Sequence, residues 1–392
     1  MSVTLADVAA RAGVSAATVS RVLNGNYPVA GSTRSRVLRA VDELEYVVNG
    51  PASALAAATS DLVGVLVNDI ADPFFGVMAS AIQSQIGPDG EHDAPHSQKM
   101  AIICNTGGSP ERELTYLTLL LRQRAAAVVL TGGTVEDPEH LAALATRLRR
   151  LEAGGTRVVL CGRQPLGPVA AGGATATGRE AERETVPGRE PAPEPEQDES
   201  WGPSPVALTF DNFGGARRLT AHLLSLGHRR IGYLAGPAAR TTTRHRLEGH
   251  RAALAEAAGA DAGRARDTDR LTVHGGYDRS SGYDGALELL RREPDLTAVV
   301  AANDTVALGA CAALRDRGLR IPEDISVAGF DDLPFAIDAA PALTTVRIPL
   351  HEAGARAGRL ALGREDAPAG RVATLPADLM VRASTAPPRA TA

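Results

Sequence analysis

The chain has 392 residues, of which 44% are hydrophobic, and a formal net charge of -5. This length exceeds one compact domain and predicts two or three domains, each with enough apolar residues for a core. No run of about 20 apolar residues occurs and a helical pattern starts at once, so we expect neither a membrane span nor a signal peptide, and a cytoplasmic location.

The negative charge is concentrated in one segment. Residues 178–200 carry eight acidic residues against three arginines, which accounts for the whole excess. Residues 1–50 hold about one net positive charge, a weak electrostatic footprint for a nucleic-acid-binding domain. Cys104, Cys161 and Cys311 lie in or beside apolar runs without CxxC spacing, which predicts buried free thiols rather than disulfides or a zinc site.

Residues 4–24 predict two short helices joined by a tight turn. Thr4 can cap the first helix in a capping box with Asp7, Gly13 ends it, and Ser15 can cap the second. In the second helix an apolar set turns inward (Val19, Val22 and Leu23), and a small polar set faces outward (Ala16, Ala17, Ser20, Arg21 and Asn24). This pattern is typical of a DNA-binding helix-turn-helix; the alternative is an ordinary helical hairpin.

A third helix, capped by Ser32 or Thr33, completes an N-terminal domain over residues 1–46. Residues 47–60 form an alanine-rich linker with Pro51 near a helix start. This segment is too short to stay helical alone in water, so we expect it to be helical only when something packs on it. The weak charge of one copy favours a dimer that reads two half-sites.

Residues 61–392 alternate apolar strand-like runs with amphipathic helices, which predicts parallel sheets covered on both faces. We predict an α/β domain of two doubly wound parallel-sheet subdomains, with a ligand cleft at the carboxyl ends of the strands. Predicted strands cover 62–67, 100–104, 126–130, 157–161, 206–210, 231–236, 298–302 and 325–330, and predicted helices lie near 74–86, 110–123, 137–152, 212–226, 246–258, 280–292 and 303–317. Two stretches interrupt the pattern, 87–99 and 165–204; the second is predicted to be a disordered insertion.

Several ordered blocks of residues resemble transcriptional regulators of the lactose/galactose repressor (LacI) family over nearly the whole chain. The blocks include Asp7-Val8-Ala9, Ala12-Gly13-Val14-Ser15, Thr18-Val19-Ser20-Arg21-Val22-Leu23-Asn24, Asn49-x-x-Ala52-x-x-Leu55, Asp72-Pro73-Phe74-Phe75, Asp211-Asn212, Leu226-Gly227-His228-Arg229-Arg230-Ile231, Arg246-Leu247-x-Gly249, Asn303-Asp304 and Ile325-Ser326-Val327-x-Gly329-Phe330-Asp331-Asp332. The resemblance implies a helix-turn-helix domain, a hinge helix and a periplasmic-binding-protein-like effector domain. It also implies a repressor that binds a palindromic operator and is switched allosterically by a sugar-like small molecule.

In that family, positions matching Ala16, Ala17 and Arg21 touch bases in the major groove. Arg21 can donate two hydrogen bonds to guanine, the strongest single discriminator here. A leucine matching Leu55 wedges into the minor groove from the hinge helix; the alternative for Leu55 is a routine contact with the effector domain. The predicted DNA-binding residues are Thr4, Ser15, Ala16, Ala17, Thr18, Ser20, Arg21, Asn24, Asn49, Ala52 and Leu55.

The predicted effector site combines aromatic and polar side chains. Phe74 and Phe75 follow the first strand of the effector domain, where aromatic faces suit a sugar ring, although they could simply pack at the helix start. The resemblance assigns polar ligand contacts to Arg240, Arg246, Asn303 and Asp331 and an aromatic platform to Tyr277, whereas Asp304 and Asp332 are interpreted as helix-cap or loop residues. The predicted effector-binding residues are Phe74, Phe75, Arg163, Arg240, Thr242, Arg246, Tyr277, Asn303 and Asp331.

Other functions lack their motifs. No phosphate-binding loop, dinucleotide fingerprint or nucleophile elbow occurs, and the histidines lack ligand spacing, so we expect no catalytic residue, cofactor or metal. A solute-binding receptor or an α/β sugar enzyme remains as an alternative. The resemblance places dimer surfaces on the helices near 74–86 and 110–123 and on part of the C-terminal subdomain. The C-terminus lacks leucine heptads, so we predict a homodimer.

Overall fold

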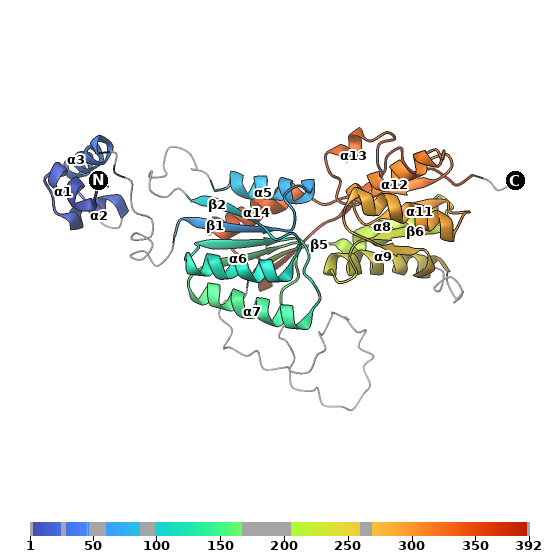
Figure 1. The fold of residues 1–392 in the computed structure, drawn as a ribbon, viewed down its shortest axis with the longest axis horizontal. Helices are drawn as coiled ribbons and strands as arrows, with labels where there is room; N and C mark the ends of the chain where they lie inside the picture. Colours follow the sequence, from blue (N-terminus) through green and yellow to red (C-terminus); the bar gives the residue numbers. More distant parts are fainter. Residues whose placement is uncertain are drawn as a thin grey trace, which may run out of the picture.

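The computed structural model describes residues 3–24, 29–44, 46, 60–86, 99–166, 205–258 and 269–389. These form an N-terminal helical unit and two α/β subdomains (Figure 1). The predicted hinge residues Asn49, Ala52 and Leu55 lie outside the described residues, as does nearly all of the predicted insertion. Among the helices that the structure describes, none combines the length and apolar character that a bilayer crossing requires.

The N-terminal unit consists of α1 (Leu5–Ala12), α2 (Ala16–Asn24) and α3 (Gly31–Glu43). The capping box forms as predicted: the Asp7 amide donates to the Thr4 hydroxyl, and the Asp7 carboxylate accepts from the Thr4 amide at 2.8 Å. Gly13 ends α1 in the left-handed conformation, with φ 66°. The three helices bury a shared core that includes Val8, Val19 and Val37.

The predicted cap of α3 was wrong. The helix begins at Gly31, and the carbonyl of Ala30 accepts from the Thr33 amide at 2.9 Å. Ser32 and Thr33 therefore lie inside the first turn, and Ala30 at the N-cap has no side chain that could accept a hydrogen bond. Packing of Val37 and Ala40 against α1 and α2 fixes this helix without a side-chain cap.

The first subdomain contains a six-stranded parallel sheet with strand order β11-β5-β4-β3-β1-β2. Its strands are β1 (Leu62–Val67), β2 (Met100–Asn105), β3 (Ala127–Thr131), β4 (Arg157–Cys161), β5 (Val206–Phe210) and β11 (Val372–Leu375). Side chains alternate between two cores: Val65 packs with α5 (Pro73–Ser84) and α14 (Leu350–Leu362), and Leu66 packs with α6 (Pro110–Arg122) and α7 (Pro138–Ala153). Figure 1 shows these helix pairs on opposite faces of the sheet.

The second subdomain has a four-stranded parallel sheet with order β7-β6-β8-β9. Its strands are β6 (Ile231–Ala235), β7 (Thr272–His274), β8 (Ala298–Ala301) and β9 (Ser326–Ala328), and its helices are α8 (Asn212–Ser225), α9 (Thr241–Ala258), α11 (Arg279–Arg292), α12 (Asp304–Asp316) and α13 (Phe335–Asp338). Helices α8 and α9 pack so closely that a Cβ on Gly249 would overlap the carbonyl oxygen of Phe213. This contact accounts for glycine in the Arg246-Leu247-x-Gly249 block.

The chain crosses between the subdomains three times: after β5, between β10 (Thr345–Arg347) and α14, and between β11 and β12 (Asp378–Met380). Strands β10 and β12 pair antiparallel with each other. The first subdomain therefore takes α14 and β11 from the C-terminal part of the chain, and neither element was predicted from the sequence. The doubly wound α/β fold itself is confirmed.

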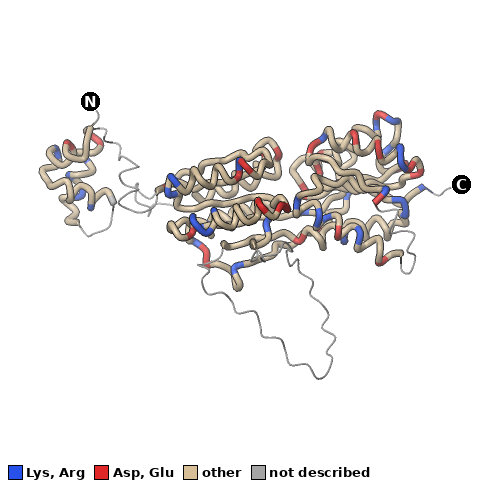
Figure 2. Tube along the Cα trace, turned by 60° about the horizontal axis from the view of Figure 1, so that its bottom comes forward, with Lys and Arg blue, Asp and Glu red and all other residues tan. Residues whose placement is uncertain are grey.

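Charged residues of both signs are interspersed along the helices of the two subdomains (Figure 2). Ion pairs such as Arg217–Glu256 and Arg292–Glu288 join neighbouring charges at 2.8 Å. The three cysteines are buried and free, as predicted.

Candidate functional site

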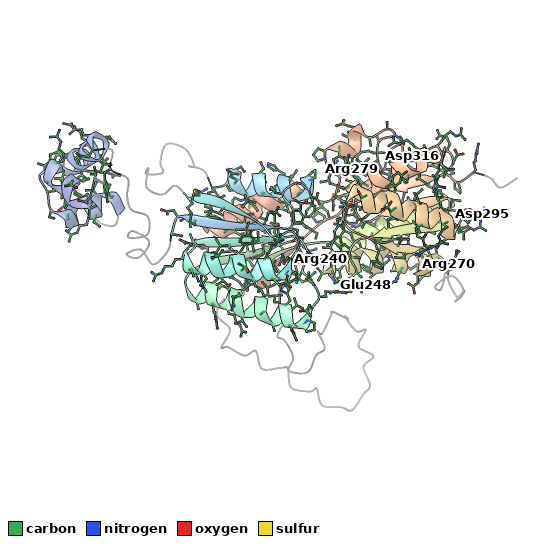
Figure 3. All side chains as sticks on the ribbon, in the orientation of Figure 1. Arg240, Glu248, Arg270, Arg279, Asp295 and Asp316 are labelled. Atoms are coloured by element: carbon green, nitrogen blue, oxygen red, sulfur yellow. The ribbon has the colours of Figure 1, made fainter. Side chains whose placement is uncertain are left out.

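A cavity of about 470 Å³ lies between the two subdomains, at the carboxyl ends of their strands. Its lining includes eight of the nine predicted effector residues: Phe74, Phe75, Arg240, Thr242, Arg246, Tyr277, Asn303 and Asp331. The ends of parallel strands lie at one edge of each sheet, so residues far apart in sequence meet there. The all-side-chain view places Arg240 where the two subdomains face each other (Figure 3).

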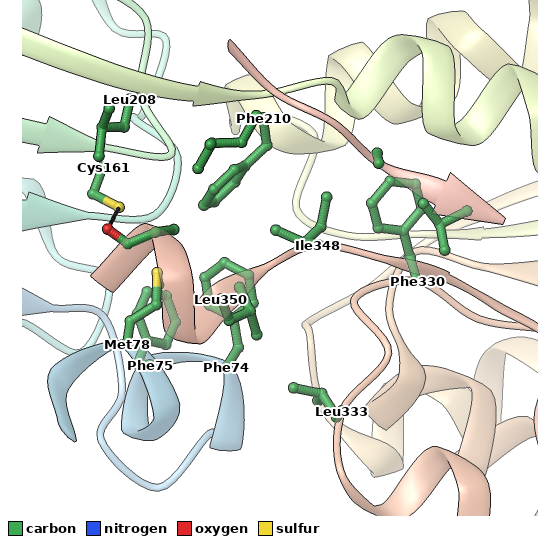
Figure 4. Packing of buried hydrophobic residues seen from close by; sticks show 14 of the residues in the cluster. Phe74, Phe75, Met78, Cys161, Leu208, Phe210, Phe330, Leu333, Ile348 and Leu350 are labelled. Atoms are coloured by element: carbon green, nitrogen blue, oxygen red, sulfur yellow. Dashed lines mark hydrogen bonds between the residues drawn. The ribbon is translucent and has the colours of Figure 1, made fainter. Parts of the chain in front are cut away.

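One wall of the cavity is aromatic. Phe74 and Phe75 occupy the first turn of α5, which Asp72 caps by accepting a hydrogen bond from the Phe74 amide at 3.0 Å. Their rings meet edge to face with centroids 5.0 Å apart, and Phe210 from β5 lies edge-on to Phe74 at 6.4 Å (Figure 4). The two phenylalanines thus belong both to the cavity lining and to the core of the first subdomain.

The facing wall carries a buried ion pair. Arg246 on α9 donates from Nη2 to Asp331 Oδ1 at 2.7 Å and from Nε to Asn212 Oδ1 at 2.8 Å. Its guanidinium also lies over the ring of Phe330, 3.7 Å from the centroid. Asp331 follows β9 with φ 101°, a conformation that L residues rarely adopt. Burial raises the pKa of Asp331, and the adjacent Arg246 opposes that rise.

Three other predicted residues make hydrogen bonds to the protein at the cleft, and of these Arg240 bridges the two subdomains. Arg240 donates from its two terminal nitrogens to the carbonyls of Gly133 (3.2 Å) and Gly108 (2.8 Å) in the first subdomain. The Tyr277 hydroxyl lies 2.6 Å from the Thr243 hydroxyl, and burial raises the pKa of Tyr277. Asn303 caps α12 by accepting from the Val306 amide at 2.8 Å.

Asp304 and Asp332 do not line the cavity, and their carboxylates bind other groups of the protein. Asp304 is fully buried and accepts from the Leu333 amide at 2.7 Å and from the Thr345 hydroxyl at 2.6 Å. Asp332 pairs with Arg347 at 2.7 Å and with Arg382 at 2.6 Å. These contacts agree with the interpretation of both carboxylates as cap or loop residues.

Arg163, the ninth predicted effector residue, does not line the cavity. It is 4% exposed and pairs with Glu113 at 2.6 Å, and it donates from Nε to the carbonyl of Gly132 at 2.8 Å. A buried carboxylate on α6 therefore holds this guanidinium behind the wall that Gly132 contributes. Sequence position next to β4 could not reveal that partner, because Glu113 lies 50 residues away.

Sequence reasoning missed several lining residues, among them Asn68, Asp69, Asp72, Phe210, Asn212 and Asp278. Asp72 and Asn212 lie within blocks already matched to the family, so these two lining residues could have been predicted from the sequence. The glycines of the lining, Gly107, Gly108, Gly132, Gly133 and Gly162, follow strand ends, where a small residue leaves room for a ligand. No group of three or more His, Cys, Asp or Glu residues within the described ranges is arranged to hold a metal ion.

In the N-terminal unit, the outer face of α2 carries the predicted DNA contacts. Ala16, Ala17 and Arg21 are exposed, and Thr18 and Ser20 are half-buried. Ser15 accepts from the Thr18 amide at 3.1 Å and so fixes the first turn of this helix. Thr4 uses its hydroxyl in the capping box of α1. Asn24 is the last residue of α2, and its side chain lies outside the described atoms.

Comparisons with known proteins agree with this arrangement. The family described as bacterial regulatory proteins, lacI family, matches residues 4–49, and the periplasmic binding protein-like domain matches residues 220–385. The transcriptional regulator GalR of Escherichia coli K12 is 33% identical over 363 residues, covering 93% of this chain and 89% of GalR. The regulator reg1 of Streptomyces lividans is 34% identical over 389 residues, covering 98% of this chain and 97% of reg1.

Solved structures show the same fold over nearly the full length. A complex of the transcriptional regulator CelR with cellobiose has a TM-score of 0.59 at 30% identity, covering 97% of this chain and 99% of CelR. The lac repressor dimer bound to operator and the anti-inducer ONPF has a TM-score of 0.69 at 25% identity, covering 98% of this chain and 100% of the repressor chain. The chain therefore belongs to the lacI family of bacterial regulatory proteins and is a helix-turn-helix transcriptional regulator.

Proposed function

We propose that this regulator is a repressor that binds a palindromic operator as a homodimer and changes its operator affinity when a sugar-like molecule occupies the cleft. The observation that carries the proposal is the presence, in one chain, of an exposed α2 face and an aromatic and polar cavity of about 470 Å³. Because the operator is chromosomal DNA, the protein would act in the cytoplasm. It would regulate without turning over its ligand.

Base reading is assigned to Arg21. A bidentate arginine–guanine contact contributes about 1–3 kcal/mol of discrimination. We expect selection from random duplexes to yield a palindrome, and Arg21→Ala to lose about 10- to 100-fold affinity for it, with relaxed preference at one base pair per half-site. Arg39→Ala, an exposed arginine on α3, is the matched control and should weaken all sequences alike. Unchanged sequence preference in Arg21→Ala would contradict this assignment.

Dimerisation is supported by apolar side chains left exposed on the first subdomain. Strand β2 is at the edge of the sheet, and its Met100 is 57% exposed and its Ile103 36% exposed. Leu119 on the neighbouring α6 is 46% exposed. An edge strand with exposed apolar residues is a surface that native proteins normally cover. Sedimentation should give a dimer, and a salt-resistant tetramer would contradict the proposal.

Effector binding is supported by the size and walls of the cavity. Its volume falls in the range of about 300–1,000 Å³ that is usual for small-molecule sites. Aromatic faces beside buried hydrogen-bonding groups suit a sugar ring, and the relative CelR was solved in complex with cellobiose. A sugar at about 100 times its dissociation constant should stabilise the protein by about 2.7 kcal/mol.

The decisive experiment measures operator affinity by gel shift with and without glucose, galactose and cellobiose. A change of about 5- to 150-fold with one sugar is the expected allosteric coupling. Chemical turnover of a bound sugar would favour the enzyme alternative. Sugar binding without any operator binding would favour a solute receptor.

The hinge carries a separate proposal. The Leu55→Ala protein should bind the operator more weakly and bend it less, because the side chain that wedges into the minor groove is removed.

A further inference from the structure

Charge in the cavity lining is unbalanced. Four carboxylates, Asp69, Asp72, Asp278 and Asp331, line it beside two guanidinium groups, Arg240 and Arg246. Binding sites for phosphate or carboxylate ligands use the opposite balance, with arginine or lysine side chains that present free donors. The lining therefore presents an excess of negative charge to any ligand.

Both arginines already donate hydrogen bonds to acceptors on the protein. All three nitrogens of Arg246 donate to protein acceptors, on Asn212, Ala302 and Asp331. Both terminal nitrogens of Arg240 donate to main-chain carbonyls of the first subdomain, which ties Arg240 to the opposite side of the cleft. An anionic ligand would therefore meet guanidinium groups that are already held by a buried carboxylate, in Arg246, or by main-chain carbonyls, in Arg240.

Two helices begin at the cavity with a carboxylate of the protein as their N-cap. Helices α5 and α11 begin at the cavity, and the positive end of a helix dipole would otherwise attract a phosphate. Asp72 already accepts from the Phe74 amide of α5, and Asp278 accepts from the Ser281 amide of α11 at 2.8 Å. The protein's own carboxylates occupy the positions that an anionic group would take.

The carboxylates also act on one another across the cleft. Asp72 belongs to the first subdomain and Asp331 to the second. Burial raises the pKa of Asp72 to about 6, and the charges of Asp331 and Asp69 push it in the same direction. A further negative charge between them would meet repulsion, whereas hydroxyl groups could donate hydrogen bonds to the carboxylate oxygens.

We infer that the effector is an uncharged polyhydroxy compound, and that the lining carboxylates Asp72 and Asp278 exclude sugar phosphates and sugar acids from the cleft. This inference rests on the proposed function, because it names the class of ligand for the same site. Discrimination by repulsion is a recognised route to specificity, since bringing like charges together is unfavourable.

The test compares glucose, galactose and cellobiose with glucose 6-phosphate, galactose 6-phosphate and cellobiose 6′-phosphate by calorimetry on the full-length protein. At least one neutral sugar should bind, and its phosphate should bind at least about 30-fold more weakly. A phosphate that binds as tightly as its neutral partner, or more tightly, overturns the inference and leaves the proposed function standing. Failure of every probe to bind, with operator binding intact, counts against the sugar effector itself.

Two variants separate charge from shape. Asp72→Asn keeps an N-cap acceptor for α5 but removes the charge, and it should reduce the neutral-to-phosphate affinity ratio at least about fivefold. Asp137→Asn is the matched control, because Asp137 also caps a helix that starts with proline, α7, and does not line the cavity. An unchanged ratio in a folded, operator-binding Asp72→Asn protein would show that shape, not charge, excludes phosphates. The double variant Asp72→Asn with Asp278→Asn should reduce the ratio further.

Discussion

Substitution Glu113→Gln tests whether the buried pair behind the cavity supports the fold. Glu113 is 6% exposed, pairs with Arg163 at 2.6 Å and lies 3.0 Å from His140 Nε2. The glutamine is nearly isosteric but leaves the guanidinium of Arg163, which is 4% exposed, without its counter-charge. Removing one partner of a buried ion pair typically costs about 3–5 kcal/mol. We therefore expect the free energy of unfolding to fall by about that amount.

The pKa of Glu113 gives a second magnitude. Burial by itself would raise this pKa, but the charge of Arg163 and hydrogen bonds from His140 and Arg163 lower it to about 2 from 4.5. A difference of that size corresponds to about 3 kcal/mol of stabilisation by the ionised carboxylate. Because the pKa is depressed in the folded state, this stabilisation is complete above about pH 4.5 and is lost as the pH falls toward 2. The stabilisation derived from the pKa therefore agrees with the cost expected for removing one partner of a buried ion pair.

Urea unfolding at pH 7, followed by circular dichroism, measures the loss directly. The comparison is the double substitution Glu113→Gln with Arg163→Met, which removes both charges of the pair and should recover part of the lost stability. If Glu113→Gln costs less than about 1 kcal/mol, or if the double variant is no better than the single one, the ion pair does not stabilise the fold as argued. The double variant should also retain sugar affinity, because Arg163 does not line the cavity.

Two further substitutions test the caps. Asp72→Asn should stabilise the protein at pH 8 by about 1–3 kcal/mol, because the pKa of Asp72 is raised from 3.8 to about 6 and its charged form is disfavoured in the fold. That gain should shrink as the pH falls through 6 and vanish near pH 4 in thermal melts; a gain independent of pH would contradict the assignment. Thr4→Ala removes the α1 capping box at about 1 kcal/mol, so amide hydrogen exchange in α1 should accelerate about fivefold. Thr4→Ser, which keeps the hydroxyl, should exchange at nearly the native rate, and equal rates in Thr4→Ala and the native protein would rule out the cap.

Most regular elements were predictable because their signals are local. Thr4, Asp7, Gly13 and Ser15 specify the ends of α1 and α2 through contacts only three or four residues apart. The buried strands β1, β3 and β4 are continuous apolar runs, so their positions could be read within a residue or two. The predicted cap of α3 was wrong because that helix depends on a contact that is not local. Packing of Val37 on the other two helices, and not a side-chain cap, fixes its position.

The strands near the C-terminus escaped prediction. β11 has the sequence VATL and β12 the sequence DLM. Both strands are short and partly exposed, so neither shows a continuous apolar run or an alternation of apolar and polar residues. β11 is a strand because the main chain of β5 pairs with it, and those two segments are separated by more than 150 residues. Pairing over such a distance depends on the crossings between subdomains, which no local pattern encodes.

The helix-turn-helix, the α/β architecture and the family could be predicted from the sequence, because capping residues, apolar periods and ordered motif blocks are local properties of the chain. Which polar residues meet could not be predicted, because it depends on how the whole chain folds. The tertiary structure placed Asp72 and Asp278 in the same cavity as Asp331 and Arg246, and it buried Arg163 against Glu113 instead. The charge of the cleft depends on distances between residues on different strands and helices, so it became apparent only once the two subdomains were folded together.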